Sequence, residues 1–248
     1  MPKWYRVTDI VVDNSHESGD LLLYAAVIHW NRVSDCFSLR LLEASIDPSY
    51  SAASEWKTRY ETKPCLKLER LSNSTGGRLA LRGNSSILLT VGDFGIRDSV
   101  LENDPDFPYG KVLELDRARW THKVFTRGNR NPQGLLVDGG EIWATEHGPH
   151  GGDELNLLIE GLDYGWPRET YGTNYGKKTF KNNPLIGDHS QSQRPVYAWI
   201  PSIGISNLVK VRGDAFPAWN GDLMVSSLTG QRNGRSIFRV RVRQPPVG

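Results

Sequence analysis

The sequence predicts an all-β protein built from many short strands. Three observations support this fold class. Convincing helical periodicity is scarce, short apolar runs recur between turn residues, and three segments share a strand–turn–strand shape. The chain of 248 residues contains 25 glycines and 14 prolines, which is typical of a turn-rich protein. Such a pattern favours a β-sandwich, a barrel or a propeller.

The candidate strands follow one another along the chain with short turns between them. Residues 21–30 have the composition of a buried strand, and residues 38–46 follow after a hairpin turn at 31–35. Residues 52–60 allow a helical turn, but they lie in a loop-like region. The other candidate strands are short apolar runs between turn residues: 78–81, 87–91, 111–116, 122–126, 134–137, 141–145, 155–159, 196–200, 222–226 and 236–242.

Internal repetition favours a propeller. Residues 79–90, 134–145 and 216–227 each contain an apolar residue, a polar turn with glycine and a second strand that ends in small polar residues. Two of these segments lead into a glycine-containing loop with a carboxylate, at 92–95 and 146–149. Repeated four-stranded blades would present such loops at one face. A two-sheet sandwich with chance similarity between its hairpins is the alternative.

Composition excludes several classes of function. The 30 basic and 28 acidic residues leave a formal net charge of +2, which gives no electrostatic argument for a nucleic acid or an anionic membrane as partner. No stretch approaches the roughly 18 apolar residues of a membrane span. Cys36 and Cys65 are the two cysteines, so a disulfide scaffold and a cysteine-based zinc site are excluded. One disulfide between them is left open.

The most informative motifs lie in residues 128–176. They are Gly-Asn-Arg-Asn-Pro-Gln-Gly at 128–134, Glu-His-Gly-Pro-His-Gly-Gly-Asp-Glu-Leu-Asn at 146–156 and Asp-Tyr-Gly-Trp-Pro at 163–167. Gly-Gly-Arg-Leu at 76–79 and Gly-Asp at 92–93 extend them toward the N-terminus. In these motifs the chain resembles the soluble PQQ-dependent sugar dehydrogenases, the glucose/sorbosone dehydrogenase family. The resemblance implies a six-bladed β-propeller of four-stranded antiparallel blades, with residues 1–248 forming one domain and the site at its top face.

The resemblance also implies residues that contact PQQ. Arg130 and Asn131 would bind the cofactor, and Arg130 would polarise a quinone oxygen. An arginine fork suits the carboxylates of PQQ, although a salt bridge between blades is the structural alternative. Trp199 matches the family's aromatic residue near the substrate. Thr229 stands where the family has a lysine that contacts the cofactor.

Calcium is the second implied cofactor. The backbone carbonyls of Gly148 and Pro149 would bind the Ca²⁺ that bridges to PQQ, in keeping with the preference of this ion for oxygen ligands. Glu154 and Tyr164 match positions that form a further calcium site, and a structural hydrogen-bonding role for Glu154 is equally open. His147 is expected to be a hydrogen-bonding loop residue rather than a metal ligand.

The chain departs from the family pattern at the general base. The family reaction removes hydride from the anomeric carbon of a sugar and needs a base for the hydroxyl proton, which is a histidine two residues before the Gly-Gly-Arg-Leu motif. Ser74 occupies this position, and a lone hydroxyl cannot replace imidazole. Phe94 stands in place of a glutamine near the sugar.

Two functional hypotheses follow. The first is PQQ- and calcium-dependent oxidation of an aldose at its anomeric carbon, with reduced or altered activity because of Ser74. The second is a non-catalytic binding module or degenerate relative on the same scaffold. The first implies an aldose sugar and an electron acceptor as partners, and it allows a homodimer. The beginning of the chain has no signal peptide, whereas the family implies a periplasmic or secreted location.

The length adds an expectation about completeness. At roughly 40–50 residues for each blade, the chain supplies about five to six compact blades. The motif at residues 76–79 lies well inside the family pattern. We therefore expect a propeller that is incomplete at one or both ends, with sheet edges that need a partner.

Overall fold

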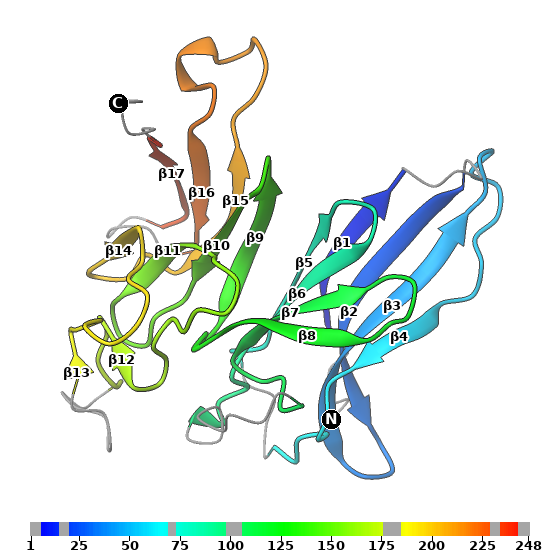
Figure 1. Cartoon of the computed structure of the whole chain (residues 1–248), viewed down its shortest axis with the longest axis horizontal. Coiled ribbons are helices and arrows are strands. Elements are labelled where there is room, and N and C mark those ends of the chain that lie inside the picture. Colours follow the sequence, from blue (N-terminus) through cyan, green and yellow to red (C-terminus); the bar gives the residue numbers. More distant parts are fainter. Residues whose placement is uncertain are drawn as a thin grey trace.

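The computed structural model describes residues 6–14, 20–68, 73–97, 106–175, 185–228 and 234–242. These residues form four antiparallel sheets, which we call blades 1 to 4, and one short parallel strand pair (Figure 1). The prediction of an all-β, propeller-like fold with antiparallel blades is confirmed, and three of the four described blades have four strands. No helix within the described ranges is long and apolar enough to cross a membrane.

The blades follow the order of the chain. Blade 1 contains β1 (Arg6–Asp13), β2 (Leu21–Asn31), β3 (Cys36–Ile46) and β4 (Lys57–Glu61). Blade 2 contains β5 (Gly76–Arg82), β6 (Ser86–Val91), β7 (Lys111–Asp116) and β8 (His122–Arg127). Blade 3 contains β9 (Pro132–Asp138), β10 (Glu141–Glu146), β11 (Asp153–Leu157) and β14 (Tyr197–Trp199). Blade 4 contains β15 (Ile205–Lys210), β16 (Leu223–Ser227) and β17 (Ser236–Val240).

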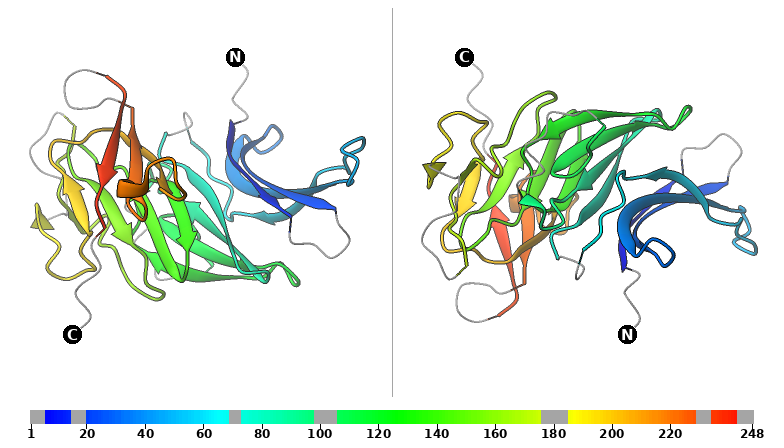
Figure 2. Two further views of the ribbon diagram at one scale, coloured as in Figure 1. Left: turned by 90° about the horizontal axis from the view of Figure 1, so that it is seen from above. Right: turned by 90° about the horizontal axis from the view of Figure 1, so that it is seen from below.

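The first strands of the blades lie beside one another. β1 contacts β5, β5 contacts β9, and β9 contacts β15, so these four strands form a common inner wall. The other strands extend outward from this wall, as the views from above and below show (Figure 2). Radial repetition of this kind is what the propeller prediction requires.

The expectation of six blades is wrong for the described residues, which form four. The spacing argument assumed compact blades, but blade 3 is interrupted between β11 and β14. The interruption holds the parallel pair of β12 (Glu169–Thr170) and β13 (Leu185–Ile186). In blade 1, β2 and β3 have 11 residues each, which uses further chain length.

The strands expected from the sequence are present, with ends shifted by at most about two residues. Five strands were not expected: β1, β4, β12, β13 and β15. No helical turn forms at 52–60, and β4 begins at residue 57. β4 has the sequence Lys-Thr-Arg-Tyr-Glu and lies at the edge of its sheet, so it has no apolar run to reveal it. β1 contains a bulge between Val7 and Asp9, which interrupts its alternation.

The core lies between the blades rather than within one layer. Three apolar clusters lie between neighbouring blades: one between blades 1 and 2, one between blades 2 and 3, and one between blades 3 and 4. β6 is buried along its whole length: Ile87 and Leu89 face blade 1, while Leu88 faces blade 3. Because successive side chains point to opposite faces, a strand between two blades becomes a continuous apolar run.

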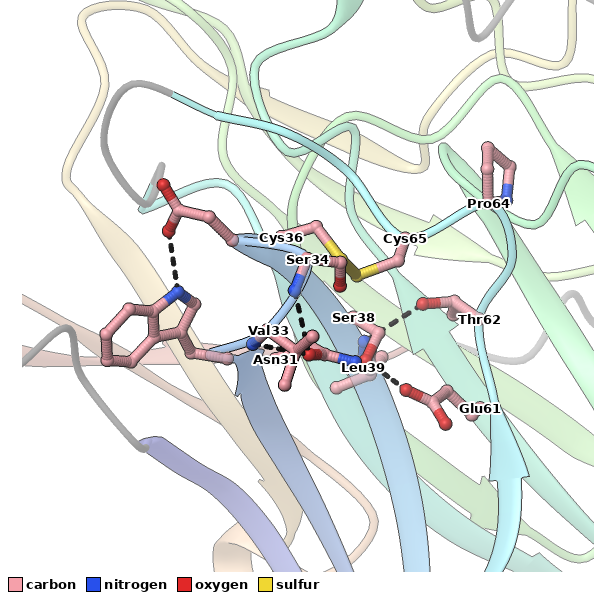
Figure 3. The surroundings of a disulfide bond; sticks show 12 residues. Asn31, Val33, Ser34, Cys36, Ser38, Leu39, Glu61, Thr62, Pro64 and Cys65 are labelled. Carbon is pink, nitrogen blue, oxygen red and sulfur yellow. Dashed lines mark hydrogen bonds between the residues drawn. A yellow bond between two sulfur atoms is a disulfide. The ribbon is translucent and has the colours of Figure 1, made fainter.

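Cys36 and Cys65 form a disulfide, which resolves the alternative left open by the sequence. Their Cα atoms are 5.6 Å apart. The bond joins the start of β3 to the segment that follows β4, as Figure 3 shows. Next to it, the Tyr109 hydroxyl donates a hydrogen bond to the Pro64 carbonyl at 2.7 Å. The disulfide-bonded segment therefore also contacts blade 2.

Candidate functional site

Three loops meet at one end of blades 2 and 3. The Asp93 amide donates to the Arg130 carbonyl at 2.8 Å, and the His147 amide donates to the Asn131 carbonyl at 3.2 Å. The Ser74 hydroxyl donates to the same Arg130 carbonyl at 3.1 Å. The segment between β8 and β9 is therefore fixed from both sides, by the loop after β6 and by the loop after β10.

The Arg130 side chain lies at the centre of this junction. Its Nη1 donates to the carbonyls of His147 at 3.0 Å and Gly148 at 2.9 Å, and its guanidinium lies over the Trp166 ring, 5.3 Å from the centroid. Its Nε is buried and has no hydrogen-bond partner among the described residues. A buried charged donor without a partner indicates room for a polar or anionic group. These contacts differ from the salt bridge between blades that the sequence left as an alternative.

Glu146 fixes the backbone that carries Arg130. It lies at the end of β10 and is buried. Its carboxylate accepts hydrogen bonds from the amides of Arg130 and Asn131 and from Asn129 Nδ2, the last at 3.1 Å. The sequence showed Glu146 as the carboxylate of the loop at 146–149, but it gave no role for this residue.

The predicted metal residues line one small cavity. Its volume is about 10 Å³, the room that one water needs. All four predicted residues, Gly148, Pro149, Glu154 and Tyr164, contribute to its wall, as does Arg130. Part of the sequence-derived site is thus brought together by the fold.

Buried acids dominate the same cavity. Glu146 and Glu154 both line it, and burial together with the charge of Glu154 raises the pKa of Glu146 to about 8. His189 Nε2 lies 3.2 Å from Glu154, and Asn156 Nδ2 donates to Glu154 at 3.2 Å. Burial lowers the pKa of His189, but the hydrogen bond and charge of Glu154 outweigh it, so the net direction is upward.

Glu146 and Glu154 lie opposite one another on β10 and β11. Two buried carboxylates in this arrangement favour a shared proton or a bound cation. No group of three or more His, Cys, Asp or Glu side chains in the described ranges is arranged to hold a metal. A cation in this cavity would therefore need backbone carbonyls as additional ligands.

The Gly148 loop is held by Asp153, which the sequence also missed. The buried Asp153 carboxylate accepts from the Gly148 amide at 3.1 Å and from the amides of Ile203 and Ile205 at 3.0 and 2.9 Å. A Cβ atom on Gly148 would lie 2.2 Å from the Gly152 carbonyl oxygen. The loop therefore requires glycine here, and it is fixed to the start of blade 4.

Asp93 is a further buried acid beside Arg130. It accepts from Trp166 Nε1 at 3.0 Å and from the Gly95 amide at 2.9 Å, and its side chain is also hydrogen-bonded to Ser74. Burial raises the pKa of Asp93 above its usual value, while Arg130 and the hydrogen bonds partly oppose the rise. The sequence showed the Gly-Asp loop but not this contact, because Ser74 and Asp93 lie on opposite sides of a hairpin.

The remaining predicted site residues are placed differently. The Trp199 ring is buried in the apolar cluster between blades 3 and 4, beside Phe238. Phe94 is buried with its edge toward Tyr109, at 5.1 Å between centroids. Thr229 lies outside the described residues. The roles expected for Trp199 and Thr229 stay predictions.

Comparison with known proteins identifies the family. Residues 7–244 match the model of the family described as Glucose / Sorbosone dehydrogenase. The chain belongs to this family.

Individual relatives are similar over shorter stretches. The chain is 29% identical over 194 residues to aldose sugar dehydrogenase YliI of Escherichia coli, a match covering 72% of this chain and 50% of the relative. It is 36% identical over 159 residues to quinoprotein glucose dehydrogenase B of Acinetobacter calcoaceticus, covering 50% of this chain and 33% of the relative. The chain thus spans half or less of the length of these relatives.

Solved structures confirm the fold. The apo-form soluble aldose sugar dehydrogenase of Escherichia coli superposes with a TM-score of 0.75 at 22% identity, covering 94% of this chain and 71% of that chain. The PQQ-bound aldose sugar dehydrogenase of Streptomyces coelicolor gives 0.62 at 22% identity, covering 94% and 65%.

Proposed function

We propose that this chain forms the cofactor-binding part of a quinoprotein that oxidises an aldose at its anomeric carbon with PQQ and Ca²⁺. The observation that carries the proposal is the Arg130–Asn131 segment held by Glu146, where the buried Arg130 Nε has no hydrogen-bond partner in the described part of the chain. Family membership and the names of the relatives support sugar oxidation. The PQQ-bound neighbour and the quinoprotein relative support the cofactor.

The residues present fit both groups. Arg130 offers a planar donor fork for a carboxylate or quinone oxygen, and Asn131 adjoins it. The carbonyls of Gly148 and Pro149 and the carboxylate of Glu154 are oxygen donors of the kind that Ca²⁺ takes, and Tyr164 completes the cavity wall. When bound, PQQ would take the hydride and Ca²⁺ would polarise its quinone.

Binding requires Arg130 to change its contacts. Its Nη1 occupies the Gly148 carbonyl, so a cation on that oxygen and the guanidinium exclude one another. Released from the carbonyls, Arg130 would turn toward the cofactor while Glu146 keeps its backbone in place. The role of Arg130 is therefore to bind and orient.

The wider proposals concern the complete protein. We propose that the chain belongs to a single propeller domain that transfers electrons to an acceptor and assembles as a homodimer. The disulfide between Cys36 and Cys65 supports an oxidising compartment, hence a periplasmic or secreted location.

Cofactor titration tests the proposal. The purified protein is titrated with PQQ in the presence of Ca²⁺, cofactor absorbance is followed, and turnover is then measured with aldoses and an artificial electron acceptor. We expect micromolar binding that Arg130→Ala abolishes. Arg127→Ala, which removes an exposed ion pair with Asp163, serves as the matched control and should leave binding unchanged. Absence of PQQ binding by the unaltered chain would overturn the proposal.

A non-catalytic binding module is the second candidate, favoured by Ser74 in place of the family histidine. PQQ binding without turnover would support it. Under the first candidate, Ser74→His raises turnover because imidazole is a stronger base near neutral pH.

A further inference from the structure

We propose that Tyr109 is a positioning residue, through which the Cys36–Cys65 disulfide of blade 1 holds the cofactor site of blades 2 and 3 in its binding arrangement. The proposal rests on the proposed function, because it concerns the affinity of that site for PQQ. It adds a consequence of its own: opening a disulfide that lies outside the site weakens cofactor binding.

The side chain of Tyr109 reaches from blade 2 to the disulfide-bonded segment of blade 1. It is fully buried, and its hydroxyl donates to the Pro64 carbonyl at 2.7 Å. Thr62 Oγ1 lies 3.1 Å from the same hydroxyl and accepts from the Leu39 amide at 2.9 Å (Figure 3). Burial raises the pKa of Tyr109 to about 12, so the hydroxyl stays protonated at neutral pH. Because Pro64 directly precedes Cys65, the disulfide holds the acceptor of this hydrogen bond in place.

The backbone beside the Tyr109 ring joins the two chain segments that lead to the site. The Gly110 amide donates to the Gly92 carbonyl at 3.2 Å, and the Gly110 carbonyl accepts from the Asn129 amide at 3.0 Å. Gly92 begins the loop after β6, and Asn129 directly precedes Arg130. The residue that follows Tyr109 is therefore bonded both to the loop after β6 and to the segment proposed to bind the cofactor.

The Tyr109 ring itself packs against Phe94. The two rings meet edge to face, with 5.1 Å between their centroids. Phe94 has a φ of 51°, in the left-handed region that a bulky side chain rarely adopts, so its surroundings must hold it there. Its amide donates to the Ser74 carbonyl at 2.8 Å, which holds the loop from the other side. A displaced Tyr109 ring would therefore free a backbone that has little preference for this conformation.

The disulfide limits the freedom of the segment that carries Pro64. A dithiol reductant opens it in a balanced exchange: the bond between the two sulfurs breaks, each sulfur takes up a proton, and the dithiol is oxidised to a disulfide. Two backbone hydrogen bonds between Phe37 and Leu66, both at 2.8 Å, do not depend on the disulfide. We therefore expect reduction to loosen Pro64 and the Tyr109 hydroxyl rather than to unfold the blade.

Hydrogen exchange of the protein without cofactor tests the coupling directly. Exchange is followed by mass spectrometry before and after addition of a dithiol. We expect reduction to speed exchange at the amides of residues 92–97 and 129–131. Tyr109→Phe, which keeps the ring and removes the hydroxyl, should speed exchange at the same amides, and reductant should then add nothing.

Tyr24→Phe is the matched control for this experiment. Tyr24 is a buried tyrosine of the same apolar cluster, and its hydroxyl accepts from Arg117 Nη2 at 2.9 Å. This variant should keep the response of the unaltered protein to reductant. Exchange at residues 92–97 and 129–131 that reduction leaves unchanged overturns the proposal, as does a Tyr109→Phe variant that still responds to reductant.

PQQ titration in the presence of Ca²⁺ tests the consequence for the site. The Cys36→Ser, Cys65→Ser variant replaces reductant here, because a dithiol would itself reduce the quinone. We expect this variant and Tyr109→Phe each to raise the Kd for PQQ about 5- to 10-fold, and their combination to raise it no further. Tyr24→Phe should bind as the unaltered protein does.

Two outcomes of the titration overturn the proposal. Additive effects would show that the disulfide and Tyr109 act separately. A Tyr109→Phe variant with lower stability but an unchanged Kd would show that Tyr109 is merely structural. If the unaltered protein binds no PQQ, the proposed function fails, and the exchange experiment still decides whether the disulfide is coupled to the site loops.

Discussion

Blades 2 and 3 have the same strand arrangement, but their buried acids have different charged neighbours. In each blade the second strand ends at a loop with a buried acid, Asp93 after β6 and Glu146 at the end of β10. Asp93 faces the guanidinium of Arg130, whereas Glu146 faces the carboxylate of Glu154. Both residues contact the same segment between the two blades: the Asp93 amide donates to the Arg130 carbonyl, and the Glu146 carboxylate accepts from the Arg130 amide.

The two buried acids differ in how their charge is balanced. The negative charge of Asp93 is balanced within the protein by Arg130 and three hydrogen-bond donors. The Glu146–Glu154 pair has His189 on one side but must still share a proton or accept a cation. The unbalanced acids of the junction therefore lie in blade 3, and its balanced acid lies in blade 2.

The largest effect is expected from removing Glu146. Glu146→Ala leaves the Arg130 and Asn131 amides and Asn129 Nδ2 without their acceptor, at about 1–3 kcal/mol for each buried group. We expect a loss of at least about 3 kcal/mol in urea unfolding. Glu146→Gln is the matched control: the raised pKa keeps Glu146 mainly neutral at pH 7, so glutamine resembles it. Equal losses in both variants would contradict this account.

Blade 1 is cross-linked by a covalent bond between the start of β3 and the segment after β4, and this segment also contacts Tyr109 of blade 2. The disulfide closes a loop with a sequence separation of 29 residues, for which chain entropy predicts about 3–4 kcal/mol of stabilisation. The Cys36→Ser, Cys65→Ser double variant should unfold at a correspondingly lower urea concentration. Reductant should lower the midpoint of the unaltered protein to that of the double variant and leave the latter unchanged. A midpoint insensitive to reductant would contradict the prediction.

Calcium is expected to stabilise the fold through an acid of blade 3 and not through an acid of blade 2. If the Glu154 cavity binds Ca²⁺, free ion at 100 times its Kd stabilises the fold by about 2.7 kcal/mol, and a chelator reverses the effect. Glu154→Gln should abolish this shift in thermal unfolding. Glu114→Gln, which alters a carboxylate paired with Arg82 and Lys123 in blade 2, should retain it. The same calcium shift in Glu154→Gln would place the ion elsewhere.

Local sequence predicted the part of the site that is contiguous in the chain. One motif contains Arg130 and Asn131, and another contains Gly148 and Pro149. The hairpin of β9 and β10 between the two motifs brings Arg130, Gly148 and Pro149 to the same cavity. The contact of Ser74 with Asp93 could not be predicted, because it depends on the bulged pairing of β5 with β6. The predicted number of blades was wrong for a similar reason. The segment between β11 and β14 has no alternating apolar pattern, so the sequence did not reveal that it interrupts blade 3.

The burial of Trp199 illustrates the same limit. An aromatic residue before Ile-Pro-Ser fits a site loop as well as a core strand. Its place between blades 3 and 4 is decided by the pairing of β14 with β11, which sequence alone does not fix.

The smallest effect is expected at the outer junction of blades 3 and 4. Lys210 on β15 lies 2.5 Å from Asp138 and 3.4 Å from Glu141, and its side chain is 19% exposed. Lys123 makes the corresponding link from β8 to Glu160, but its side chain is 56% exposed. Exposed ion pairs contribute about 0–1 kcal/mol and are screened by salt. We therefore expect Lys210→Ala to lower the free energy of unfolding by about 0.5–1 kcal/mol, more than Lys123→Ala. Urea unfolding at low and high salt measures both, and a larger loss in Lys123→Ala would show that burial does not rank these two links.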